Sequence, residues 1–85
     1  MLNAEPFEPV TLYFPLRGGG YGRVRLAWVP NGQLIQYLQD KAVREFHLLT
    51  ARKHCRVRDQ RARSLRLGSA VEPGSVIVMQ RVGST

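Results

Sequence analysis

Apolar and polar residues alternate with period two along three stretches of this sequence, 10–16, 23–29 and 54–59. Successive side chains of a strand point to opposite faces, so this alternation predicts strands with one buried and one exposed face. The side chains expected to face the core are Val10, Leu12, Phe14, Val24, Leu26, Trp28, Cys55 and Val57. The opposite face then carries Thr11, Tyr13, Arg23, Arg25, Ala27, His54, Arg56 and Arg58.

Two further segments extend the predicted sheet toward the C-terminus. The run 75–82 is the most continuously apolar part of the chain, which is typical of a central strand. A short strand is predicted over 64–68, with Arg66 facing outward. Between them, Pro73 followed by Gly74 is the order that a type II turn requires.

One segment, 32–46, has the spacing of a helix instead. Its apolar residues recur every three or four positions, which places them on one face of an amphipathic helix. Asn31 or a neighbour is expected to cap the first free N–H groups. The stripe consists of Leu34, Ile35, Leu38, Ala42 and Phe46.

Four glycines lie between the first two predicted strands, at positions 18, 19, 20 and 22. They predict a flexible hairpin connection. A glycine-rich loop can also hold a phosphate, but the GxGxxG spacing is absent and no Lys-Ser/Thr pair opens a helix here. The hairpin is therefore the favoured interpretation.

The order strand, strand, helix, strand, short strand, strand resembles the β-grasp, or ubiquitin-like, family. The closing segment AVEPGSVIVMQRV is similar to the L-x-x-G-D-x-V-x-I ending of its sulfur-carrier and TGS-like branches, with Val71, Gly74, Val76 and Val78 at the corresponding positions. The S4 type of RNA-binding domain closes in a similar way. The resemblance implies an α+β domain over 10–82, with one helix packed on one face of a mixed sheet of four to five strands. An extended N-terminal arm over 1–9 and a short tail over 83–85 complete the chain.

The resemblance stops short of the family's conjugation chemistry. Sulfur carriers and ubiquitin-like modifiers end in Gly-Gly, whereas this chain ends in Val-Gly-Ser-Thr, and Ser75 stands where the pattern has aspartate. What the resemblance implies is a β-grasp domain used for binding alone.

Charge is the compositional outlier in these 85 residues. Thirteen Lys and Arg against six Asp and Glu give a formal net charge of +7, which favours acidic protein, nucleic acid or an anionic membrane as partner. The single cysteine suits a reducing compartment. No apolar run approaches the length of a membrane span, and acidic residues stand where a signal peptide needs basic ones. We expect a soluble cytoplasmic protein, or a virion component, without a membrane partner.

Catalytic and metal-binding arrangements are weak in this sequence. Cys55 is a candidate nucleophile with His47 or His54 as base, but neighbours on a strand point to opposite faces, which disfavours the pair formed by His54 and Cys55. These three residues fall short of the four ligands of a structural zinc site. The acidic residues are scattered. We therefore expect no enzymatic activity, metal, cofactor or small-molecule substrate.

Positive charge is concentrated on one predicted surface. More than half of it lies in Arg52, Lys53, Arg56, Arg58, Arg61, Arg63 and Arg66. Strand alternation places Arg56, Arg58 and Arg66 on the sheet face opposite the helix, together with Arg23 and Arg25 of the opening hairpin. The β-grasp order, if it holds, implies that Tyr13 lies on that face between the two basic groups. Arginine suits bidentate contacts to carboxylate or phosphate.

Two functions are compatible with this surface. The first is a non-enzymatic structural or docking subunit of a larger assembly, such as the head or tail of a bacteriophage virion. It would contact other protein subunits with acidic surfaces through the arginine-rich face, and through the acidic N-terminal arm with Glu5, Phe7 and Glu8. The alternative is an RNA- or single-stranded nucleic-acid-binding domain, in which Tyr13 stacks a base and the arginines hold the backbone.

Overall fold

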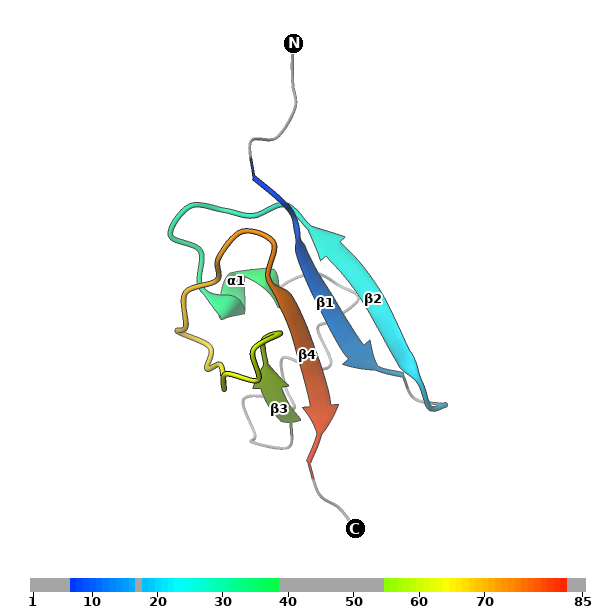
Figure 1. Cartoon of the computed structure of the whole chain (residues 1–85). Coiled ribbons are helices and arrows are strands. Elements are labelled where there is room, and N and C mark those ends of the chain that lie inside the picture. Colours follow the sequence, from blue (N-terminus) through cyan, green and yellow to red (C-terminus); the bar gives the residue numbers. More distant parts are fainter. Residues whose placement is uncertain (1–6, 17, 39–54, 83–85) are drawn as a thin grey trace.

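The computed structural model describes residues 7–16, 18–38 and 55–82 (Figure 1). Within these ranges it is a small α+β domain. Four strands form one sheet, and a short helix follows the opening hairpin. The elements are β1 (Val10–Pro15), β2 (Tyr21–Leu26), α1 (Leu34–Tyr37), β3 (Cys55–Arg58) and β4 (Val76–Arg81).

The sheet is mixed and has the order β2-β1-β4-β3. β1 pairs antiparallel with β2 and parallel with β4, while β3 pairs antiparallel with the other side of β4. In Figure 1 the four strands lie side by side, and the first and last strands of the chain occupy the middle. The two central strands therefore join the N-terminal hairpin to the C-terminal half.

The core lies on one face of this sheet. Leu12 and Ile77 of the central strands are fully buried, and so are Leu34 and Leu38, at the start of the helix and just after it. The alternation predicted for the strands is confirmed, because every apolar residue assigned to the inner face of β1 and β2 is buried or packs against the core. The core also contains Val10, Phe14, Tyr37, Val57, Leu65, Val71 and Met79.

The opening hairpin starts its second strand two residues earlier than predicted. Tyr21 pairs with Pro15, and Gly22 pairs with Phe14, whose ring fills the space that a side chain at position 22 would need. The same strand ends at Leu26 rather than 29. Trp28 leaves the sheet, and its indole N–H donates to the Val71 carbonyl at 2.5 Å.

Helix α1 begins at Leu34, two residues after the start of the predicted segment, and its cap is Gln33 and not Asn31. The Gln33 N–H donates to the Gln36 side-chain oxygen at 2.7 Å, which satisfies one donor at the helix end. The next two free donors are satisfied by a distant loop, since the N–H groups of Leu34 and Ile35 donate to the carbonyls of Ser69 and Leu67. The rest of the predicted helix, 39–46, lies outside the described residues.

The short strand predicted over 64–68 is wrong. Ser64 makes a single bridge to Arg58, and the Leu65 N–H donates to the Val57 carbonyl, after which the chain turns away from β3 toward the helix. The physical reason is that the backbone partners change along the segment: the Leu65 N–H bonds to β3, but the Leu67 carbonyl accepts the N–H of Ile35 at the start of the helix. Arg66 therefore lies in a loop and not on the sheet.

The predicted turn before β4 is confirmed. Gly74 has a φ of 76°, and the Ser75 N–H donates to the Glu72 carbonyl at 3.2 Å. A positive φ at the third position of a type II turn favours glycine because it has no Cβ. The turn also holds the N-terminal segment, since the Gly74 N–H donates to the Glu8 carbonyl at 3.1 Å.

Candidate binding surface

One row of side chains crosses all four strands in register on the face opposite the core. Tyr13 of β1 is paired with Arg23 of β2 on one side and with Val78 of β4 on the other. Val78 is in turn paired with Arg58 of β3. Two arginines on the edge strands thus flank a tyrosine and a valine on the central strands.

Neighbouring rows repeat this arrangement in part. Arg25 of β2 is paired with Thr11, which is paired with Val76 of β4. Toward the other end of the sheet, Arg56 is paired with Gln80. We call this surface the outer face; it consists of Thr11, Tyr13, Pro15, Tyr21, Arg23, Arg25, Arg56, Arg58, Val76, Val78 and Gln80.

The outer face has an uncharged centre and basic edges. Tyr13, Val76 and Val78 are half-buried, and Arg23 and Arg25 on the β2 edge are exposed. The four strands contain no Asp or Glu, so nothing on the strands themselves neutralises the arginines. The placement of Arg23, Arg25, Arg56, Arg58 and Tyr13 on one face, predicted from alternation, is thus the placement observed.

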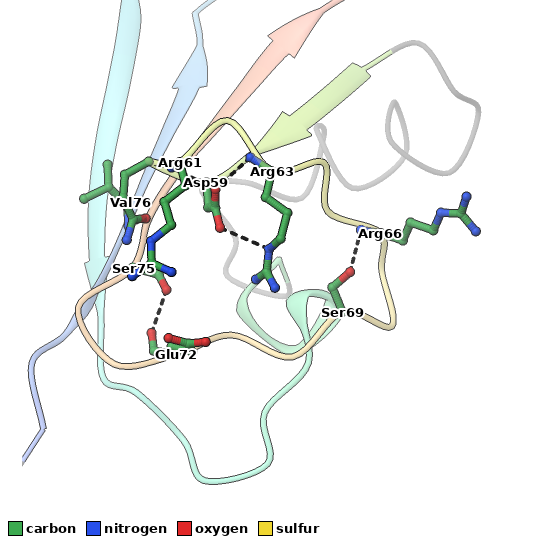
Figure 2. A network of polar contacts seen from close by, with 9 residues as sticks. Asp59, Arg61, Arg63, Arg66, Ser69, Glu72, Ser75 and Val76 are labelled. Atoms are coloured by element: carbon green, nitrogen blue, oxygen red, sulfur yellow. Dashed lines mark hydrogen bonds and ion pairs between the residues drawn. The ribbon is translucent and has the colours of Figure 1, made fainter.

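Three other arginines predicted for the basic surface lie in the loop after β3 and not on the sheet. Arg61 and Arg63 belong to the loop after β3, and Arg66 extends away from that loop in Figure 2. The expectation that Arg66 shares the outer face is wrong, because 64–68 leaves the sheet. Arg52 and Lys53 lie outside the described residues.

The described part of the N-terminal arm lies against its own domain. The Phe7 ring packs on Trp28 with centroids 4.5 Å apart, although Phe7 remains 45% exposed. The Glu8 carbonyl accepts the hydrogen bond from the turn before β4. Glu5 lies outside the described residues.

The loop after β3 is organised around the Asp59 carboxylate (Figure 2). One carboxylate oxygen accepts the backbone N–H groups of Arg61 and Arg63, both at 2.9 Å. The other accepts from the Arg63 guanidinium at 3.2 Å. Ala62 between them has a φ of 62°, a left-handed conformation that these contacts hold in place. The backbone N–H and the guanidinium of Arg63 therefore both bond within this loop.

These contacts also change the acidity of Asp59. Partial burial raises the pKa of this carboxyl, but N–H donation by Arg63 and Arg61 and the charge of Arg63 outweigh it, so the pKa lies below 3.8. A folded-state pKa below the unfolded value means that the carboxylate stabilises the fold above the unfolded pKa. That contribution is lost as the pH falls through the folded pKa.

We expect Asp59→Ala to lower the free energy of unfolding at neutral pH and to lose much of this effect in acid. Urea titrations of both proteins at about pH 7 and about pH 3 measure the difference. Asp59→Asn is the matched control, because its amide oxygen can still accept the two backbone N–H groups but carries no charge. A difference between Asp59→Ala and the parent that is as large in acid as at neutral pH would contradict the role of the charge.

A groove lies at one end of the outer face and was not predicted from the sequence. It has a volume of about 450 Å³ and lies where the glycine loop between β1 and β2 meets the end of β4. The alternation of Arg23 and Arg25 could have been extended to Tyr21. The parallel pairing of β1 with β4, which brings the glycine loop close to the end of β4, is not visible in the sequence. The groove is lined by Pro15, Leu16, Gly19, Gly20, Tyr21, Arg56, Gln80, Arg81 and Val82.

The described residues form neither a metal site nor a membrane-spanning helix. No cluster of three His, Cys, Asp or Glu side chains is placed there to hold a metal, and His47 and His54 lie outside the described ranges. Over the same ranges, no helix has the length and apolar character needed to cross a membrane.

Comparison with known proteins adds no relative: the chain matches no protein-family model, no curated protein and no solved structure.

Proposed function

We propose that this protein is a non-enzymatic docking module whose outer face binds an acidic surface of another protein. The observation that carries the proposal is the row formed by Arg23, Tyr13, Val78 and Arg58, which places half-buried, uncharged side chains between two basic edges. Protein interfaces combine a desolvated apolar centre with a polar rim, and Tyr and Arg are enriched among their most important contacts.

The architecture supports a β-grasp module as the scaffold. The resemblance rests on an opening hairpin, one helix across the sheet and the closing segment AVEPGSVIVMQRV. The hairpin, a short helix packed on one face and a closing strand after the turn at Gly74 are compatible with it. In the described part of the chain the helix and core occupy one face of the sheet, so a partner would use the opposite face. In this proposal α1 and the core act as scaffold and the outer face as the site.

The spacing of the charges favours protein over nucleic acid. Adjacent strands lie about 4.8 Å apart, so the arginines of the two edge strands are separated by about 14 Å across the centre. A single nucleic-acid strand needs cations along one track and several aromatic side chains for stacking. The central row offers one tyrosine with valine beside it, which suits apolar contact with a protein.

Photocrosslinking at the centre of the outer face tests the proposal. A photoreactive amino acid replaces Tyr13 in the full chain, and the protein is irradiated in the cells that produce it. We expect a discrete protein–protein adduct that resists nuclease. An adduct that disappears after nuclease treatment would instead support single-strand binding, and failure to form any adduct would contradict docking through this face.

Charge reversal on the two edge strands provides the second test. Arg23→Glu combined with Arg58→Glu should reduce the adduct roughly tenfold or more, since like charges then face the acidic partner. Arg61→Glu combined with Arg66→Glu is the matched control, because it makes the same change in net charge in the loop after β3, away from the outer face. An equal reduction by the control would mean that net charge, rather than the outer face, attracts the partner.

A further inference from the structure

The groove at the end of the outer face combines an apolar wall with basic groups. Leu16, Tyr21 and Val82 are 45%, 49% and 42% exposed, and all three line it. They are three of the five large apolar side chains that are strongly exposed in the described part of the chain. Exposed apolar side chains that gather at one concave place indicate a contact site more strongly than scattered ones do.

The basic side of the groove comes from the strands. Arg56 of β3 and Arg81 at the end of β4 both line it, with the Gln80 amide beside them. Both arginines already take part in an interaction within the chain, and a guanidinium carries five N–H donors, so it can bond to more than one acceptor at a time. None of the described residues that line the groove is acidic.

The glycine loop leaves the groove accessible. Gly19 and Gly20 form part of its wall in left-handed conformations, with φ of 105° and 75°, and a side chain at either position would meet no atom within 4 Å. The loop is closed by hydrogen bonds between Leu16 and Gly20 and between Gly19 and Leu16. The backbone is thus held in place while the space above it stays open.

We infer that this groove anchors a peptide segment of the partner that carries a large apolar side chain flanked by carboxylates. The apolar side chain packs against Leu16, Tyr21 and Val82, and the carboxylates pair with Arg56 and Arg81. This inference rests on the proposed docking function, because the groove shares Tyr21, Arg56 and Gln80 with the outer face. A peptide that continues onto the outer face gains contacts there, whereas a free small molecule in an open groove leaves much of its surface in water.

Two matched peptides test the inference on the full chain. The first is acetyl-Asp-Glu-Leu-Glu-Asp-amide, and the second has Ser in place of Leu. In titrations followed by ¹H–¹⁵N NMR, we expect the Leu peptide to shift the amides of 19–21 and 80–82 and to bind about fivefold more tightly than the Ser peptide. Equal binding of the two peptides would overturn the role of the apolar wall.

Substitutions of residues that line the groove test its role in peptide binding separately from the rest of the outer face. Arg81→Gln and Tyr21→Ala should each weaken binding of the Leu peptide about fivefold, and Arg66→Gln should leave it unchanged. The dispersion of the amide spectrum shows whether each variant is folded, and the conservative Tyr21→Phe should retain binding if the apolar ring is what matters. Unchanged binding by a folded Arg81→Gln variant would refute the site.

The same titrations distinguish the two proposals. Shifts confined to 11–13, 23–25 and 76–78 would overturn the groove while leaving docking by the outer face intact. Shifts in the groove together with a failure of the Tyr13 crosslink would overturn the outer face as the docking surface. Adenosine monophosphate and unlabelled Leu peptide are then compared as competitors for bound Leu peptide. If adenosine monophosphate displaces it at the lower concentration, the groove is a nucleotide site and the peptide anchor is refuted.

Discussion

Leu38→Ala is expected to lower the free energy of unfolding by about 2 to 5 kcal/mol. Leu38 follows α1 directly, is fully buried, and belongs to the cluster formed with Leu12 and Ile77 of the central strands. Truncation removes apolar contact and leaves a cavity that the paired strands cannot close without losing their register. Urea denaturation followed by circular dichroism measures the loss.

Leu16→Ala is the matched control for this substitution. It removes the same atoms, but Leu16 is 45% exposed beside the glycine loop, so the cost should stay below about 1 kcal/mol. If Leu38→Ala proves too unstable to fold, Leu38→Met keeps most of the volume and should cost less than about 1.5 kcal/mol. A loss no greater for Leu38→Ala than for Leu16→Ala would mean that the segment after the helix does not pack on the sheet.

Gly32→Ala is expected to cost about 2 to 4 kcal/mol, for a steric reason that the sequence does not reveal. A Cβ at this position would lie 2.8 Å from the Tyr37 hydroxyl oxygen and 2.9 Å from the Val29 carbonyl oxygen. Those two groups are part of one closed turn, since the Val29 N–H donates to the Tyr37 hydroxyl at 2.9 Å. The turn must open, or the buried Tyr37 must move, and either change strains the start of the helix.

A double-substitution cycle identifies the contact responsible. Tyr37→Phe removes the hydroxyl that a Cβ at position 32 would meet, so Gly32→Ala should cost less in that background than in the parent. Gly18→Ala is the control, because a Cβ there meets no atom within 4 Å. Costs that add without coupling would place the strain of Gly32→Ala at the Val29 carbonyl or the ring of residue 37 and not at the hydroxyl.

Local periodicity was enough to predict most of the strands and their faces. In β1 and β2 the identity of the inward and outward side chains follows from alternation alone, and the turn at Gly74 follows from its neighbours. Prediction failed at 64–68, where the alternation resembles that of a strand but the Leu67 carbonyl accepts an N–H group at the start of the helix. Tyr37 was also missed as a core residue, because its hydroxyl needs the polar partner that the Val29 turn provides.

The sequence by itself determined the chemical character of each face, since period-two alternation separates apolar from basic side chains whatever the strand is paired with. Only the tertiary structure decided which of those side chains are neighbours. The row through Arg23, Tyr13 and Arg58 depends on the parallel pairing of β1 with β4, and the groove depends on that same pairing to bring Tyr21 and Arg81 together. Register is set by contacts between residues far apart in the chain, and a pattern within one segment carries no information about them.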